Sequence, residues 1–190
     1  MSRKILLLTG DGGDSYEVLY AYQRFLEARW EPVVAAPSRR TLHLLIHDRE
    51  PGWSTYVERP GHLMDADVAV TAVAVKDFAA LLILGGRAPE YLRNDPSVLS
   101  LVREFAGQGK CLFAIGHGIQ LLTAAGLTTG RVMTGHQHVQ IEVERGGGRY
   151  VERPAVRDGK LITGQTWRSH PDFYREVFAC LGELSRAAGS

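Results

Sequence analysis

The segment Ala114-Ile115-Gly116-His117-Gly118 follows the apolar run Cys111-Leu112-Phe113 and precedes a second apolar segment at residues 119–125. This order predicts a buried strand, a sharp turn and a helix, the layout that presents a nucleophile to substrate above an α/β sheet. The residue at the tip of the turn is Gly116, which has no side chain. The segment therefore predicts the backbone of a catalytic elbow without the Cys or Ser that such a turn usually carries.

Short apolar runs alternate with helical patterns along the rest of the chain. The runs that predict strands lie at residues 5–8, 31–36, 80–84, 111–115, 131–134 and 161–163. The patterns that predict helices lie at residues 15–28, 97–108, 119–125 and 171–184. Strands of continuous apolar character separated by helices favour a parallel sheet that is covered on both faces. We therefore expect one α/β domain, residues 1–190, with a doubly wound, mostly parallel sheet sandwiched by helices.

Two segments break this alternation. Residues 37–63 are rich in Arg, His, Pro and Gly, and we expect them to form a small hairpin and loop at an edge of the core. Residues 135–158 contain Gly146-Gly147-Gly148 and alternate polar with apolar side chains, which predicts hairpin-like strands. The end of the chain, residues 185–190, is expected to fray.

Composition narrows the possible partners. The 190 residues are 45% hydrophobic and carry 22 basic against 21 acidic side chains, a formal charge of +1. This balance favours neither nucleic acid nor an anionic membrane as a partner. No apolar stretch approaches the roughly 20 residues that a membrane span needs. The first residues lead straight into a predicted core strand without a signal-peptide pattern, so we expect a cytoplasmic protein. Cys111 and Cys180 lie in apolar stretches without metal-ligand spacing, so we expect both thiols to be buried and reduced.

Ligands bind to such sheets at the carboxyl ends of the strands, so we expect the chemistry in the loops at those ends. The loops at residues 10–14, 85–90, 116–118 and 135–138, with the first turn of the first helix, converge there. They carry the candidate catalytic residues Asp14, Glu17, His117, His136 and His138. They also carry the candidate substrate-binding residues Asp11, Gly86, Arg87, Glu90 and Gly116. These groups suffice for acid–base catalysis on a small molecule without a cofactor.

Four runs resemble the ThiJ/PfpI family, which belongs to the class I glutamine amidotransferase-like superfamily and has a flavodoxin-like sheet. The runs are Gly85–Arg93, Ala114–Gly118, Gln120–Gly126 and Asp158–Thr163. Further matches, at residues 47–48, 55–56, 60–62 and 167–171, resemble the branch that contains the two-domain plant proteins with glyoxalase III-type activity. The resemblance spans nearly the whole chain.

The resemblance implies roles for several residues. The family's reactive cysteine falls on Gly116, and the histidine that follows it falls on His117. A first-loop glutamate, which hydrogen-bonds the thiol in relatives, falls on Asp14. Glu90 matches an acid that reaches a neighbouring subunit in protease-like relatives, so the resemblance implies a homodimer or a homohexamer.

The chain departs from the family at the position that matters most for chemistry. Cysteine-based hydrolysis, deglycation and glyoxalase reactions begin with thiolate attack on a carbonyl, and Gly116 offers no group that attacks. Cys111 and Cys180 are not placed to substitute for the missing thiol. Glycine tolerates a strained elbow, so the N–H groups of the turn can still serve as an oxyanion site.

Three hypotheses for the function remain open. In the leading one, His117, His136 or His138 works with Asp14 or Glu17 on a small carbonyl compound, by enolisation, hydration or lyase chemistry. In the second, the protein binds a small molecule without catalysis. In the third, hydrolase activity of the protease, amidase or glyoxalase type survives through an activated water.

The histidines separate these hypotheses. If the cluster is catalytic, we expect His117, His136 and His138 to face one cavity, with one of them within hydrogen-bond reach of Asp14 or Glu17, which would raise its pKa. Alternatively, His136 and His138 are exposed loop residues, or bind a metal ion together with His117 or Asp14. The remaining four histidines are interpreted as structural: His43, His47, His62 and His170.

Overall fold

A computed structural model of the chain describes residues 2–187. Its centre is a seven-stranded sheet in the order β10-β11-β7-β6-β1-β2-β5. All neighbouring strands of this sheet are parallel except the pair β10 and β11. The strands are β1 (Lys4–Leu8), β2 (Glu31–Ala36), β5 (Val68–Ala69), β6 (Ala80–Ile83), β7 (Cys111–Ile115), β10 (Ala155–Asp158) and β11 (Leu161–Gly164). The predicted doubly wound, mostly parallel sheet is confirmed.

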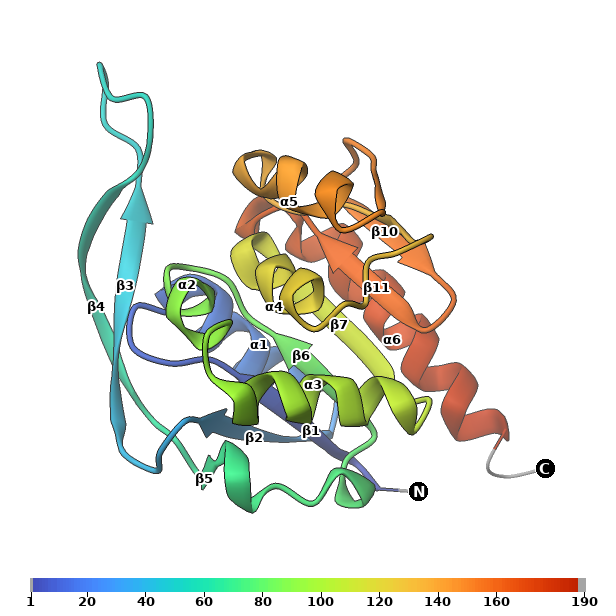
Figure 1. Cartoon of the computed structure of the whole chain (residues 1–190). Helices are drawn as coiled ribbons and strands as arrows, with labels where there is room; N and C mark the ends of the chain where they lie inside the picture. The colour runs from blue at the N-terminus through green and yellow to red at the C-terminus, as the bar shows by residue number, and fades with distance from the viewer. Residues whose placement is uncertain (1, 188–190) are drawn as a thin grey trace.

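Helices cover both faces of this sheet (Figure 1). On one face lie α1 (Ser15–Glu27) and α6 (His170–Ala187), and on the other lie α3 (Pro96–Gly107) and α4 (Ile119–Ala124). Alternate residues of each strand enter opposite cores, so that in β1 Ile5 packs against the first pair of helices and Leu6 against the second. No helix among residues 2–187 is long and apolar enough to cross a membrane.

Strand order reverses beside β1, because β2 lies on one side of β1 and β6 on the other. The chain therefore leaves β1 and β6 in opposite directions above the sheet, and the gap between the two departing loops is where ligands bind in open α/β sheets. The short helix α2 (Ala88–Leu92) follows β6 at this edge. The 3-10 turn η3 (Gly116–Gly118) follows β7 there too, as predicted for an elbow.

A long antiparallel hairpin stands beside the main sheet (Figure 1). It consists of β3 (Thr41–Asp48) and β4 (Val57–Asp65), which confirms the hairpin predicted for residues 37–63 and extends it by two residues. The backbone N–H of Gly12 donates to His43 O at 2.8 Å, and that of Leu45 donates to Gly13 O at 2.9 Å. These bonds fasten the hairpin to the loop after β1, so that the hairpin rises beside the carboxyl end of the sheet (Figure 1).

The prediction of hairpin-like strands within residues 135–158 is wrong for the first half of that segment. The structure has a 3-10 turn η4 (Gln137–Val139) and a helix α5 (Gln140–Arg145) instead. Val139 and Val143 are buried while Ile141 is 52% exposed, so burial follows the helical spacing of four and not the strand spacing of two. The predicted strand near residue 132 exists as β8 (Val132–Met133), but it pairs with β9 (Arg149–Tyr150) in a separate small sheet.

The remaining elements are short. They are the 3-10 turns η1 (Val70–Ala72), η2 (Val75–Asp77) and η5 (Trp167–Ser169). The last helix continues to Ala187, and residues 188–190 of the segment expected to fray lie outside the described part of the chain.

Gly86 should be intolerant of any side chain, because the loops after β1 and β6 meet there. Its φ is +78°, and a Cβ built on it would lie 2.3 Å from the backbone nitrogen of Asp14. We expect Gly86→Ala to lower the free energy of unfolding by at least about 1 kcal/mol in urea denaturation.

Gly182→Ala is the matched control, because a Cβ at Gly182 in α6 meets nothing within 4 Å. This change should raise stability by about 0.5–1 kcal/mol, since alanine is the better helix former. Equal effects of the two substitutions would contradict the close approach of the two loops.

Candidate active site

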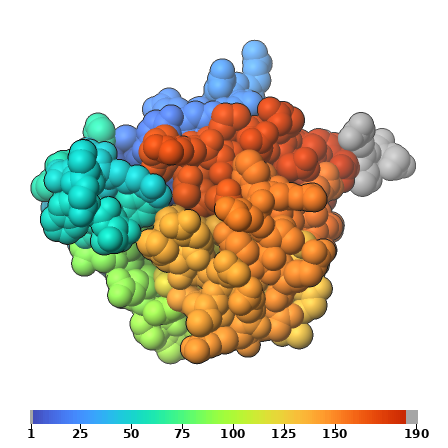
Figure 2. Space-filling model, turned by 90° about the horizontal axis from the view of Figure 1, so that it is seen from above, coloured from blue at the N-terminus to red at the C-terminus, as the bar shows by residue number. Residues whose placement is uncertain are grey.

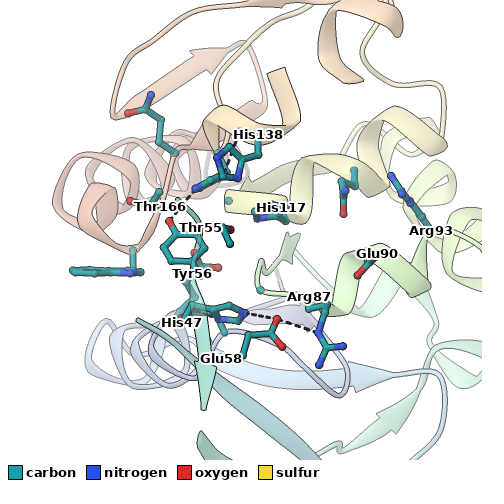
Figure 3. Close-up of a pocket in the computed structure, with 18 residues that line it drawn as sticks. His47, Thr55, Tyr56, Glu58, Arg87, Glu90, Arg93, His117, His138 and Thr166 are labelled. Carbon is teal, nitrogen blue, oxygen red and sulfur yellow. Dashed lines mark hydrogen bonds and ion pairs between the residues drawn. The ribbon is translucent and has the colours of Figure 1, made fainter. Parts of the chain in front are cut away.

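A cavity of about 430 Å³ opens at the carboxyl ends of β1, β6, β7 and β11, and the hairpin forms one of its walls (Figure 3). Nine of the ten predicted site residues line it: Asp14, Glu17, Gly86, Arg87, Glu90, Gly116, His117, His136 and His138. The other lining residues are His47, Thr55, Tyr56, Glu58, Arg93, Gln120, Gln165, Thr166 and Trp167. The cavity is therefore built from the loops after four strands of the main sheet, from the loop after β8 that carries His136 and His138, and from the hairpin.

Asp11 is the predicted site residue that does not line the cavity. Its carboxylate accepts a hydrogen bond from the backbone N–H of His43 at 2.8 Å and pairs with Arg40. Asp11 thus holds the start of β3 against the first loop. The loop turns after Gly10, which sends the side chain of Asp11 to the outer side and that of Asp14 to the inner side.

Gly116 is the floor of the cavity. Its φ is +60°, in the left-handed region that side chains rarely adopt, and a Cβ built on it would lie 3.1 Å from Glu17 Oε1. The empty position at the tip of the elbow therefore borders a carboxyl group.

Glu17 is that carboxyl group, and it is buried with 3% of its surface exposed. Its Oε2 accepts a hydrogen bond from the backbone N–H of Gly85 at 2.8 Å. Burial raises the pKa of Glu17 well above its ordinary value, and the neighbouring charge of Asp14 adds to the shift. Glu17 thus keeps its proton to higher pH than an exposed glutamate does, and its Oε1 faces Gly116.

Asp14 has a different role from the one that the family resemblance implied. Its Oδ1 accepts a hydrogen bond from the backbone N–H of Glu17 at 2.8 Å and caps helix α1. Its Oδ2 lies 2.9 Å from Nδ1 of His47. Placing the thiol-facing acid at Asp14 was therefore a wrong prediction, because the helix turns Glu17, three residues later, toward Gly116.

The three predicted imidazoles come together at one side of the cavity (Figure 3). The rings of His117 and His136 are stacked with centroids 4.7 Å apart, and the ring of His138 meets that of His136 edge-on at 4.5 Å. Burial lowers the pKa of His117 to about 4 and that of His136 to about 3. Both rings are therefore neutral near pH 7.

The expected pairing of these imidazoles with a carboxylate was wrong. Within residues 2–187, no ring nitrogen of His117, His136 or His138 is hydrogen-bonded to Asp14 or Glu17. Burial, with the neighbouring imidazoles adding to it, consequently lowers the pKa of His117 and His136 where a carboxylate partner would have raised it.

His47 is the imidazole that Asp14 orients, although the sequence suggested a structural role for it. Its Nδ1 faces Asp14, and its Nε2 lies 3.6 Å from Glu58 Oε1. Glu58 in turn binds Nε of Arg87 at 3.0 Å, so a line of alternating charged and polar groups forms one wall (Figure 3). The match of residues 47–48 to the plant-like branch was the signal that could have placed His47 here.

The hairpin also contributes Tyr56, which sequence reasoning did not single out as a site residue. Its hydroxyl lies 2.9 Å from Nε2 of His136 and joins the hairpin tip to the other wall of the cavity. Figure 2 looks down on this end of the molecule and shows the teal hairpin tip directly beside the gold and orange atoms of the C-terminal half.

Residues 2–187 contain no group of three or more His, Cys, Asp or Glu side chains placed to hold a metal ion. His136 and His138 lie in a turn and not on a strand, so their rings meet edge-on and do not point side by side at one site. The metal alternative for these two residues therefore has no ligand set in the described part of the chain.

Glu17→Gln should change how stability depends on pH. The native pKa of Glu17 is raised above its ordinary value of 4.5, so the folded state holds a proton that the unfolded state releases. The free energy of unfolding of the wild type should therefore fall as pH rises from about 4.5 through the native pKa. Glutamine cannot ionise and keeps an oxygen for Gly85 N–H, so its advantage over the wild type should grow between about pH 5 and about pH 8.

The measurement is urea denaturation at both pH values. Glu27→Gln, on the exposed end of the same helix, is the control. Its free energy of unfolding relative to the wild type should change little between the two pH values. If the free energies of unfolding of Glu17→Gln and the wild type changed with pH in parallel, burial would not shift the pKa of Glu17.

Comparison with known proteins places this site in a family. The profile of the DJ-1/PfpI family matches residues 3–179. "Protein DJ-1 homolog D" of Arabidopsis thaliana is 36% identical over 95% of this chain and 48% of its own length, so the chain spans about half of that relative. "Protein/nucleic acid deglycase 2" of Escherichia coli is 30% identical over 96% of this chain and 99% of its own length.

Solved structures agree with the fold. A ThiJ/PfpI domain protein from Brachyspira murdochii superposes with a TM-score of 0.83 at 19% identity, over 96% of this chain and 98% of that one. Schizosaccharomyces pombe DJ-1 superposes with a TM-score of 0.74 at 24% identity, over 93% and 90%. The predicted resemblance to the ThiJ/PfpI family is therefore confirmed, and the chain belongs to the DJ-1/PfpI family.

Proposed function

We propose that this protein is an enzyme that performs acid–base chemistry on a small carbonyl compound without a nucleophilic cysteine. The observation that carries the proposal is the pair of His117 and Glu17 beside the empty position of Gly116. Burial moves their pKa values in opposite directions, so that His117 is an unprotonated base near pH 7 while Glu17 keeps its proton to higher pH than an exposed glutamate does. Groups whose environments separate their pKa values in this way are the usual acid and base of an active site.

The positions of the two cysteines support a reaction without a thiol nucleophile. The sequence contains two cysteines, and both Cys111 and Cys180 are buried in the core between the sheet and helices α1 and α6. Neither lines the cavity. The Escherichia coli relative is named a protein/nucleic acid deglycase, and that name is consistent with carbonyl chemistry as the proposed substrate class. At Gly116 this chain has space where a side chain would otherwise stand, so a substrate can lie against the backbone of the elbow.

Enolisation is the simplest reaction that these groups perform. The C–H bond next to the carbonyl breaks, its proton passes to an unpaired ring nitrogen of His117, and its electron pair forms the C=C bond of an enolate. Glu17 then donates its proton to the enolate, and the proton on His117 returns to Glu17 directly or through water. Within residues 2–187 neither ring nitrogen of His117 has a hydrogen-bond partner, which leaves it available for this transfer.

Hydrogen–deuterium exchange tests the proposal directly. In D2O the enzyme should replace the α-protons of a small hydroxycarbonyl compound such as dihydroxyacetone or hydroxyacetone faster than buffer does, as followed by proton NMR. His117→Gln should lower the exchange rate roughly 100-fold or more, because it removes the base.

His43→Gln is the matched control. His43 lies on the same hairpin strand as His47 but is exposed and outside the cavity, so its substitution should leave exchange unchanged. Binding of these compounds without exchange would contradict the proposal and would identify a binding protein. Equal exchange by His117→Gln and the wild type would remove His117 as the base.

Methylglyoxal tests the absence of thiol chemistry. We expect the wild type to consume it at the background rate and Gly116→Cys to raise that rate, because the new thiol would stand beside Glu17 Oε1. Gly182→Cys, which adds a thiol on helix α6 away from the cavity, should not raise it. Consumption by the wild type at a rate that Gly116→Cys does not exceed would contradict this reading.

A further inference from the structure

The tautomer of His136 follows from its surroundings. The backbone N–H of His138 donates to Nδ1 of His136 at 3.2 Å. A backbone N–H can only donate, so Nδ1 must present its lone pair. The ring is neutral because burial lowers its pKa to about 3, and its one proton is therefore on Nε2.

This tautomer decides the direction of the next hydrogen bond. Nε2–H of His136 donates to the hydroxyl oxygen of Tyr56 at 2.9 Å, so Tyr56 is the acceptor in that contact. The hydroxyl still has its own proton, and within residues 2–187 no acceptor receives it. Tyr56 lines the cavity between His47 and the imidazole wall (Figure 3).

We propose that Tyr56 is a further catalytic residue, which donates its hydroxyl proton in a hydrogen bond to the carbonyl oxygen of the substrate. This inference rests on the proposed acid–base function. Removal of the α-proton by His117 places negative charge on that oxygen, and a donor already aimed at it lowers the barrier. Three bonds in series, from His138 N–H to His136 to Tyr56 to substrate, polarise one another in the same direction.

The same chain of bonds separates the roles of the two stacked imidazoles. His136 has Nδ1 occupied by the backbone and Nε2 occupied by Tyr56, so it has no lone pair for a substrate proton. His136 is therefore a positioning residue, and the base is His117, whose nitrogens have no partner. Ring contacts hold Tyr56 in place, with His136 at 5.3 Å, His47 at 6.0 Å and the Arg49 guanidinium 5.6 Å from the ring centre.

Tyr56→Phe tests the donor, because it removes the hydroxyl and keeps the ring. We expect a loss of roughly 100-fold in the rate of α-proton exchange at saturating hydroxyacetone, with a small change in KM, as for removal of one oxyanion donor. Tyr16→Phe is the control, since Tyr16 is an exposed tyrosine outside the cavity lining. His136→Gln, which keeps an N–H donor, should retain far more activity than His136→Leu, which has none.

Two readouts do not depend on turnover. Long-range proton–nitrogen NMR should show His136 as the neutral Nε2–H tautomer from about pH 5 to about pH 8, and its N–H resonance should move in Tyr56→Phe. Glycolohydroxamate, a planar mimic of an enediolate, should bind Tyr56→Phe at least about tenfold more weakly than the wild type in calorimetry, which is the loss of one buried hydrogen bond.

The outcomes distinguish this inference from the proposed function. An Nδ1–H tautomer, or unchanged exchange in Tyr56→Phe while His117→Gln loses it, would overturn the role of Tyr56 and leave the acid–base function standing. If the wild type exchanges no probe, the proposed function fails, and the calorimetric comparison alone then decides whether Tyr56 donates to a bound oxyanion. If the wild type and Tyr56→Phe bound glycolohydroxamate equally well, or if neither bound it, the donor role of Tyr56 would be overturned.

Discussion

The buried residue Asp14 holds three parts of this molecule together, two through its carboxylate and one through its backbone N–H. One oxygen caps helix α1 at Glu17 N, and the other binds His47 on the hairpin. The backbone N–H of the same residue bonds Gly85 O in the loop after β6. A cap contributes about 1 kcal/mol, and a hydrogen bond to a buried charge contributes about 1.5–3 kcal/mol. Helix, hairpin and switch-point loop are therefore joined through one residue, and the cavity lies where they meet.

Burial at this meeting point explains the chemistry of the cavity. The desolvation that raises the pKa of Glu17 also lowers the pKa of His117 and His136, because low polarity disfavours any charge. A neutral imidazole carries one ring proton and can hold a defined tautomer, whereas a doubly protonated ring has a proton on both nitrogens. In the proposed reaction, this difference in environment is what separates the acid from the base.

The hairpin supplies what the main sheet lacks. His47, Tyr56 and Glu58 come from β3, the loop before β4 and β4, far in sequence from the elbow at Gly116. The register of β3 and β4 shifts between His43 and Leu45, so two histidines with the same strand parity reach different surroundings. His43 is exposed while His47 is enclosed, and sequence spacing alone could not separate them.

The sequence by itself determined the sheet, its covering helices, the elbow and most of the lining, because apolar runs, glycines and strand-end loops follow local rules. It also located the family through the loop after β6 and the turn at Gly116. Tertiary structure alone decided that Glu17 rather than Asp14 borders Gly116, that residues 140–145 are helical and that Tyr56 meets His136. These features depend on which distant groups share a buried space, since long-range packing sets desolvation and hydrogen-bond direction and no local pattern records it.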